Sequence, residues 1–360
     1  MRCTVRCTEH LFPASYEAIH RFDDAAVEHG KRGPLVPCAV QPRDLAIVHA
    51  VWRYKFLTTP QLLELWWPDA AAWAGQRRLL KLFQAGYLDR FRPVARRGSH
   101  PWTYRIDREG LRLLQAAGVV GRRERYEHRA IYDYGYVLHD VQLNAWVIAW
   151  RRMLGERLLE WRGETNIEPP QGLRAQRPLR LEGDWSAEDL RDPRPRLLRP
   201  DAIVETVRRD GAGSRTFLIE FDRTGRVDKN LEKFRRYDAF LIWWWRHTEY
   251  GDMGEAPYVI FVCQTGDQRD RFLAAADHEL TGHHWHPSRA PEEQIYVGRS
   301  RILFATEGEM HAGEVRAARV SGFPREKPSR ESSSLSPRLV RLPGGTRAPA
   351  AEHAVTTPRS

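Results

Sequence analysis

The spacing of apolar residues divides the first half of the chain into helical and extended segments. Helical spacing covers RDLAIVHAVWRYKF, a short stretch after Thr58-Thr59-Pro60, and DAAAWAGQRRLLKLFQAG. A threonine followed by proline is typical of a helix start. Two strand-like runs, GYLDRFRPV and WTYRID, flank the basic turn ARRGSHP, and REGLRLLQAAG resumes helical spacing. This order of three helices, two strands and a helix predicts a winged helix-turn-helix.

The second half of the chain shows a different order of predicted helices and strands. YGYVLHDVQLNAWVIAWRRMLG has helical spacing, and ERLLEWRGE, RPDAIVETVRR and RTFLIEFDR follow as strand candidates. KNLEKFRRYDAFLIWWWR is again helical, APYVIFVCQT is an apolar strand, RDRFLAAADHEL is a helix and RILFATEGE is a last strand. Helix, three strands, helix, strand is the core order of restriction-endonuclease-like domains. The predicted fold class is therefore α/β, with a separate α+β winged helix at the N-terminal side.

The amino-acid composition along the chain indicates the domain boundaries. A first segment rich in Gly, Pro, Cys and His shows little periodicity, and the last segment is dominated by Ser, Pro, Arg, Gly and Ala. Such segments bury too little apolar surface to fold alone. The predicted organisation is a poorly ordered extension (1–40), the winged helix (41–118), a linker (119–130), the endonuclease-like domain (131–308) and a disordered tail (309–360).

The charge is unevenly distributed along the 360 residues. The net charge is +10, and residues 41–130 alone hold 17 Lys and Arg against 8 Asp and Glu. A basic surplus in one domain indicates a polyanion partner, double-stranded DNA in the first place, although a solvated charged face is a common alternative. The four cysteines suggest no pairing, and no apolar run is long enough for a membrane span, so we expect a cytoplasmic protein.

The third predicted helix carries the candidate DNA-binding face. In a winged helix this helix enters the major groove, and the loop between the two strands contacts the backbone. An alternative is that the module serves protein docking or dimerisation, which leaves a homodimer open. The candidate DNA-binding residues on the helix and the loop are Trp73, Gln76, Arg77, Arg78, Lys81, Arg96, Arg97, Ser99 and His100.

Three carboxylates form the candidate catalytic and metal site. Asp201 opens the second predicted strand of the second domain, and Glu220 and Asp222 end the third, where alternation places both on one face. Neighbouring strands would bring these side chains together, and like charges so close favour a cation. Oxygen ligands suit Mg²⁺ or Mn²⁺, which could activate water for phosphodiester hydrolysis.

The PD-(D/E)xK nucleases that this order resembles carry a lysine two residues after the acid. Asp222 occupies that position here, so Lys229 or Lys233 on the following helix is the candidate replacement. The alternative is a nuclease fold kept for binding or assembly, in which these carboxylates form structural ion pairs.

The chain as a whole resembles the replication-relaxation family of plasmid and conjugative-element proteins. The resemblance covers about residues 43–305 and rests on WRYKFLTTPQLLEL, QRRLLKLFQAGYLDRFRPVARRGSHPWTYRIDREGLRLLQAAG, LHDVQLNAW, RPDAIVE and FLIEFDRTGRVDKNLEKFRRYDAFL. It implies a DNA-binding accessory of plasmid replication, mobilisation or DNA relaxation, working with other plasmid replication or mobilisation proteins. A metal-dependent nicking or cleaving nuclease and a transcriptional regulator are the alternatives.

Overall fold

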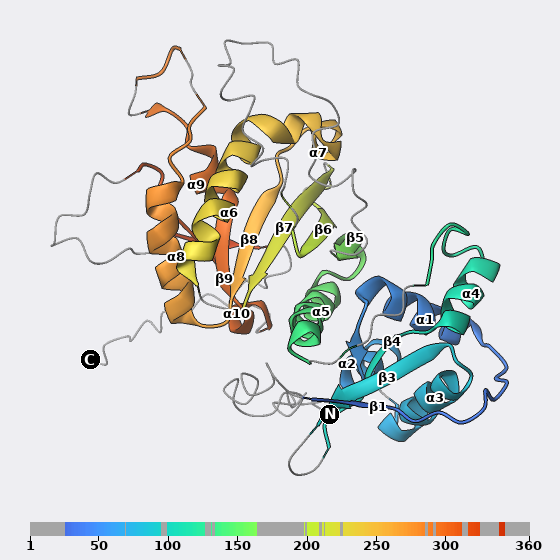
Figure 1. The fold of residues 1–360 in the computed structure, drawn as a ribbon. Helices are drawn as coiled ribbons and strands as arrows, with labels where there is room; N and C mark the ends of the chain where they lie inside the picture. Colours follow the sequence, from blue (N-terminus) through green and yellow to red (C-terminus); the bar gives the residue numbers. More distant parts are fainter. Residues whose placement is uncertain are drawn as a thin grey trace, which may run out of the picture. The chain divides into compact units, whose positions relative to one another are not determined.

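The protein has a mixed α/β fold with two separate sheets, which confirms the predicted class at this level (Figure 1). This computed structural model describes residues 26–68, 70–94, 99–126, 131, 134–163, 198, 200–208, 211, 213–223, 226–284, 287–290, 293–311, 316–324 and 338–342. The chain divides into two compact units. Unit 1 contains Met1–Ala149 and Arg162–Pro169, and unit 2 contains Trp150–Trp161 and Pro170–Ser360.

Unit 1 combines helices with a small antiparallel sheet of strand order β1-β3-β4-β2. The side chain of Thr58 accepts a hydrogen bond from the Gln61 amide, and the Gln61 side chain accepts one from the Thr58 amide at 2.8 Å. This reciprocal cap explains why α2 begins where the threonine and proline predict. The elements are β1 (Val27–His29), α1 (Pro42–Tyr54), β2 (Leu57–Thr58), α2 (Thr59–Trp66), α3 (Ala72–Gln84), β3 (Leu88–Pro93), β4 (Thr103–Ile106) and α4 (Arg108–Ala116).

Part of the segment predicted as a poorly ordered extension (1–40) is built into this sheet. Val27–His29 form β1 and pair antiparallel with β3, with His29 opposite Phe91. The amide of Val36 then donates to the carbonyl of Gln84 at 3.1 Å. A strand of three residues is too short to show a periodic pattern in the sequence. It is stabilised by its partner across the sheet instead. Residues 1–25 lie outside the described part.

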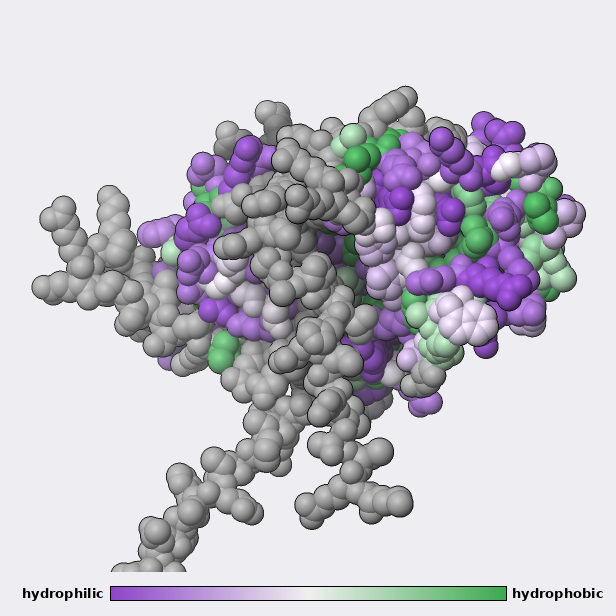
Figure 2. Space-filling view, turned by 90° about the horizontal axis from the view of Figure 1, so that it is seen from below, coloured by the Kyte–Doolittle hydropathy of each residue, from purple (hydrophilic) through white to green (hydrophobic). Residues whose placement is uncertain are grey.

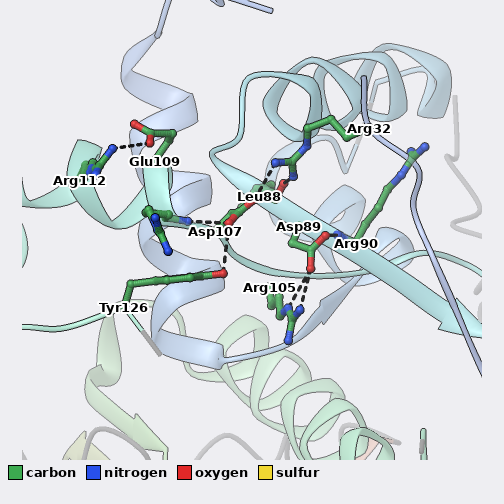
Figure 3. Close-up of polar contacts among 10 residues, drawn as sticks. Arg32, Leu88, Asp89, Arg90, Arg105, Asp107, Glu109, Arg112 and Tyr126 are labelled. Carbon is green, nitrogen blue, oxygen red and sulfur yellow. Dashed lines mark hydrogen bonds and ion pairs between the residues drawn. The ribbon is translucent and has the colours of Figure 1, made fainter. Parts of the chain in front are cut away.

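The predicted linker (119–130) packs against α4 in its described part. Tyr126 donates to Asp107 at 3.1 Å, and Asp107 also accepts from Arg32 at 2.7 Å and from the Arg108 amide (Figure 3). Burial and the neighbouring charge of Asp107 raise the pKa of Tyr126 to about 12. Asp107 therefore ties the segment before α1, the start of α4 and the segment after α4 together. Residues 127–130 are outside the described part.

Helix α5 (Gly135–Leu154) crosses the boundary between the units, which lies at Ala149 and Trp150 rather than at the predicted residue 131. Its first turns share a core cluster with the small sheet, whose members are Phe56, Phe91, Ile131, Tyr134, Val137 and Leu138. The Asn144 amide nitrogen donates to the carbonyls of Tyr54 at 2.9 Å and Phe56 at 2.6 Å. Periodicity identifies the helix, but it does not say which unit covers its apolar face.

Unit 2 is built on a seven-stranded sheet of order β11-β10-β9-β8-β7-β6-β5. Strands β6 and β7 are antiparallel, whereas β7, β8 and β9 are parallel. Helices α6 and α8 lie side by side over one face of this sheet (Figure 1). The elements are β5 (Leu158–Gly163), β6 (Ala202–Val207), β7 (Ser214–Asp222), α6 (Val227–Ala239), α7 (Glu249–Asp252), β8 (Tyr258–Cys263), α8 (Gly266–Glu279), α9 (Val297–Arg301), β9 (Ile302–Thr306), α10 (Glu307–His311), β10 (Arg316–Arg319) and β11 (Arg338–Arg341).

The predicted disordered tail (309–360) contributes two of these strands. β10 and β11 extend the sheet antiparallel from β9. Arg299, only 1% exposed, donates to the carbonyls of Ser321 at 3.1 Å and Phe323 at 2.8 Å and pairs with Asp277 at 2.8 Å. The composition of the tail is poor in large apolar residues, so its order depends on sheet pairing and on this buried arginine. Residues 312–315, 325–337 and 343–360 lie outside the described part.

Asn144→Leu should lower the free energy of unfolding by about 2–4 kcal/mol, because two buried carbonyls lose their donor. Chemical denaturation of the full chain measures the change. Arg151→Gln, at an exposed position of the same helix, should change stability little. Equal stability of Asn144→Leu and the parent would show that Asn144 does not hold α5 to unit 1.

Candidate functional site

Helix α3 presents a basic face to solvent. Leu79, Leu82 and Phe83 are buried on its inner side. The exposed residues recur at intervals of three and four, so they share the opposite side, and they are Trp73 (65% exposed), Gln76, Arg77 and Lys81. In the space-filling view, hydrophilic residues cover much of the described surface on the right, with hydrophobic residues between them (Figure 2).

Arg78 does not belong to that exposed face. Its guanidinium forms an ion pair with Asp44, a residue of α1 that is 0% exposed, and donates to the carbonyl of Ala39 at 2.8 Å. The hydrogen bond to Asp44 is the main reason why the pKa of Arg78 is raised. A buried carboxylate needs such a partner. Arg78, a candidate DNA-binding residue, therefore anchors α3 to α1 and does not share the exposed side of α3 with Arg77 and Lys81.

The loop between β3 and β4 is described only in part. Arg96 and Arg97 lie outside the described residues, Ser99 is exposed and His100 is half-buried. Burial, followed by the charge of Arg92, lowers the pKa of His100. The lowered pKa favours the neutral form of His100, which adds a hydrogen-bonding ring to the base of this loop.

Two arginines of β3 stack on aromatic rings beside the loop, which the sequence reasoning did not foresee. The Arg90 guanidinium lies 4.4 Å from the ring centroid of Phe83 and 4.3 Å from that of Trp102. Arg92 also lies 4.3 Å from Trp102. Arg90 and Arg92 are two residues apart on one strand and so share a face, which was the available signal. The stack fixes both cations where β3 enters the loop.

In unit 2 the structure brings Asp201 and Glu220 together at the edge of the sheet where β6 begins and β7 ends. The Asp201 carboxylate accepts from the Phe221 amide at 2.7 Å, and the Asp201 amide donates to the carbonyl of Ile219 at 2.8 Å. Glu220 is 2% exposed. One of its oxygens accepts from the Tyr237 hydroxyl at 2.6 Å, and the other pairs with the Lys233 ammonium.

The environment shifts the pKa of each of these groups. Burial, and then the charge of Asp201, raises the pKa of Glu220 to about 7, although Lys233 and Tyr237 act in the opposite direction. Burial lowers the pKa of Lys233, but attraction to Glu220, Asp201 and Asp222 outweighs it, so the net shift is upward. Burial and the charge of Glu220 raise the pKa of Tyr237 well above its usual value. Lys233 is therefore the charged cation of the cluster at neutral pH.

Helix α6 supplies the partners of the carboxylates. Asn230 donates to Asp222, while Lys233 and Tyr237, one and two turns further on, contact Glu220. Lys229 is exposed, and no described contact links it to the three carboxylates. Sequence reasoning missed Asn230 and Tyr237. Their spacing from Lys233, three residues before and four after, places all three on one helix face and could have identified them.

The three carboxylates, as arranged, do not fit a divalent cation. Both oxygens of Glu220 already take donors from Tyr237 and Lys233, and one oxygen each of Asp201 and Asp222 takes an N–H. Within the ranges that the structure describes, no three His, Cys, Asp or Glu side chains are grouped to hold a metal ion. The Lys233 ammonium supplies the positive charge that a metal would bring, so we derive no metal-dependent step from this cluster.

The family model for replication-relaxation proteins matches residues 49–252. The chain belongs to the replication-relaxation family. Membership indicates a role in replication or relaxation and thus involvement with DNA, and the match spans the α3 face and the carboxylates of β6 and β7. Neither the curated proteins nor the solved structures contain a match to this chain. None of the helices in the described ranges has the length and apolar character needed to cross a membrane.

Replacing Glu220 by Gln should change how stability depends on pH. Because the folded-state pKa of Glu220 is about 7 and its unfolded value is about 4.3, its contribution to stability is present below pH 4 and is lost as the pH rises to 7. Glu220→Gln removes this loss. The melting temperature of the variant relative to the parent should therefore rise between about pH 4.5 and 7 and level off above.

Thermal melts of both proteins across this range measure that difference. Glu307→Gln is a suitable comparison, because burial raises the pKa of Glu307 to about 8. The melting temperature of Glu307→Gln relative to the parent should therefore continue to rise up to about pH 8. A difference between Glu220→Gln and the parent that stays constant with pH would contradict the raised pKa.

Proposed function

We propose that this replication-relaxation protein binds duplex DNA through unit 1, as an accessory protein of plasmid or mobile-element replication, mobilisation or DNA relaxation. The observation that carries the proposal is the exposed basic face of α3. In this proposal the elements from α1 to α4 act as a winged helix-turn-helix, with α3 in the major groove and the β3–β4 loop against the phosphate backbone.

Some cationic side chains of unit 1 form ion pairs with carboxylates, and others do not. Arg32, Arg78 and Arg105 pair with Asp107, Asp44 and Asp89 respectively. Arg77 and Lys81, by contrast, take part in no ion pair among the described residues and are both exposed. A cation that binds a DNA phosphate releases a condensed counterion from the DNA. A side chain without an ion pair in the protein can do so without breaking a protein contact, which favours Arg77 and Lys81 as phosphate contacts.

The aromatic residues near this face support the same proposal. Trp73 exposes 65% of its surface on the first turn of α3. An indole on a groove-facing helix can lose that exposed apolar area against the sugars or base edges. Arg90, stacked on Trp102, would hold positive charge at the base of the loop beside Arg92, which is paired with Glu28, and Ser99 and His100 add hydrogen-bonding groups there.

Unit 2 serves in this proposal as a restriction-endonuclease-like scaffold that organises DNA or other replication and mobilisation proteins. Its carboxylates are matched internally by Lys233, Tyr237 and Asn230. That matching suits a structural cluster better than a metal-dependent nuclease, because Glu220 would have to exchange a protein donor for the metal at either of its oxygens. No described feature favours a transcriptional regulator.

Arg77→Ala/Lys81→Ala should weaken binding to duplex DNA and reduce the slope of log affinity against log salt by up to about 1.8, about 0.9 for each lost phosphate contact. Fluorescence anisotropy with a labelled duplex at several salt concentrations measures both quantities. Arg112→Ala removes another exposed arginine of unit 1, on α4, and should leave the slope unchanged. Parent-like affinity and slope in the double variant would refute the α3 assignment.

Mg²⁺ or Mn²⁺ should neither stabilise the protein nor support strand breakage, because the carboxylates already have protein partners. The melting temperature in millimolar Mn²⁺ should equal that in chelator, and supercoiled plasmid should remain intact in both. A Mn²⁺-dependent shift or nicking activity that Asp201→Asn abolishes would instead establish the nuclease alternative.

A further inference from the structure

Three arginines of unit 2 converge on a single carboxylate at the edge of the sheet opposite the Glu220 cluster. Arg215 lies near the start of β7 and Arg301 ends α9, directly before β9. Arg208 follows β6, which runs antiparallel to β7 and ends at the same edge. Glu255 precedes β8, whose first residue is Tyr258. All these residues come from the edge where the parallel strands β7, β8 and β9 begin.

The contacts at this edge are specific. Arg301 and Arg215 both approach the same oxygen of Glu255, at 3.1 Å and 3.7 Å, and Arg208 approaches the other oxygen at 2.8 Å. The guanidinium of Arg301 also lies 4.5 Å from the ring centroid of Tyr258, and that of Arg215 lies 5.2 Å from it. One carboxylate and one aromatic ring thus hold Arg215 and Arg301 close together.

The charge at this cluster is not balanced by Glu255. Arg215 and Arg301 alone carry two positive charges against one carboxylate. Elsewhere in unit 2 the ratio is reversed, since Arg269 pairs with both Asp270 and Glu309. Two guanidiniums that share one oxygen repel each other, and a second anion would relieve this repulsion.

Arg215 and Arg301 also keep donors for such an anion. A guanidinium has five N–H donors. The side chain of Arg215 is 31% exposed and that of Arg301 is 22% exposed, so part of each remains in reach of solvent and of an anion. Planar guanidiniums bind the oxygens of a phosphate group in pairs, which makes phosphate the best match for two adjacent arginines.

We propose that Arg215, Arg301 and Arg208, fixed by Glu255 and Tyr258, form a binding site for a phosphate group. The site is separate from the α3 face and does not depend on the DNA-binding role proposed for unit 1. The phosphate group belongs either to a nucleic-acid backbone or to a free phosphate or nucleotide, and these two sources share the same chemistry at the site.

Thermal melts of the full chain in sodium phosphate and in sodium chloride of equal ionic strength test this site. A ligand that binds only the folded state raises the melting temperature. We expect phosphate to add about 2–4 °C over chloride when it is present at several times its dissociation constant. The added shift should fall in Arg215→Ala/Arg301→Ala to the general salt effect of phosphate and stay at the parent value in Arg235→Ala, which removes an arginine paired with Glu279.

Two further variants keep the test decisive if the double variant folds poorly. Glu255→Gln removes the competing carboxylate, so it should lower the melting temperature in chloride yet increase the added shift in phosphate. Arg215→Lys keeps the charge but loses the paired donors, so its added shift should be smaller than that of the parent. A purely structural network would leave only the general stabilisation by phosphate, so the added shift would be the same in all of these proteins, and that result would overturn the proposal.

Anisotropy with a duplex, and with a phosphorylated nucleotide in competition, separates the two sources. A backbone phosphate at this site predicts that Arg215→Ala/Arg301→Ala reduces the salt slope of DNA binding by up to about 1.8. An unchanged slope, together with a phosphate shift that the nucleotide reproduces, assigns the site to a free phosphate or nucleotide. Loss of DNA binding in Arg77→Ala/Lys81→Ala tests unit 1 alone and bears on neither result.

Discussion

The burial of Glu220 is the constraint on which the arrangement of unit 2 depends. A carboxylate that is 2% exposed is stable in the fold only if it is protonated or matched by donors and opposite charge. Lys233 and Tyr237 meet this requirement, and both belong to α6. The same helix meets Asp222 through Asn230. The position of α6 over β7 is therefore fixed by polar matching as well as by the aromatic packing of Phe234 against Phe261 and Phe304.

Unit 1 also contains a buried carboxylate that needs a partner of opposite charge. Asp44 is completely buried, and Arg78 is the partner that it requires. Because Arg78 is committed to the interior, its neighbour Arg77 is placed on the outer side of α3 with Lys81. Adjacent arginines in one sequence thus have opposite roles, one holding α3 to α1 and the other leaving its charge in solvent. The basic surplus that the sequence shows for this region is divided by ion pairing into structural and available parts.

Periodicity predicted the long elements of the fold and some of the site, because those signals are local. The positions of α1 to α4 and β5 to β9 follow from apolar spacing, and the proximity of Asp201 and Glu220 follows from adjacent strands. The strands β1, β10 and β11 have three or four residues each and depend on pairing with other strands, which in the case of β1 is β3, far away in the sequence. The same holds for the commitment of Arg78 to Asp44 and for the division of α5 between units. These features arise from tertiary contacts, so no local sequence pattern predicts them.

The two ends of the central strands of unit 2 differ in how their charges are matched. At the end of β7, Glu220 and Asp222 are held by donors from α6 and Asp201 by the Phe221 amide, and the raised pKa of Glu220 reduces their net charge further near neutral pH. At the start of β7 and β8, guanidiniums outnumber the one carboxylate that they share. An order of helices and strands that resembles a nuclease does not by itself decide where chemistry or binding occurs. Among the described residues of this unit, Arg215 and Arg301 place more positive than negative charge at the edge away from Glu220, and that edge is the one suited to an external anion.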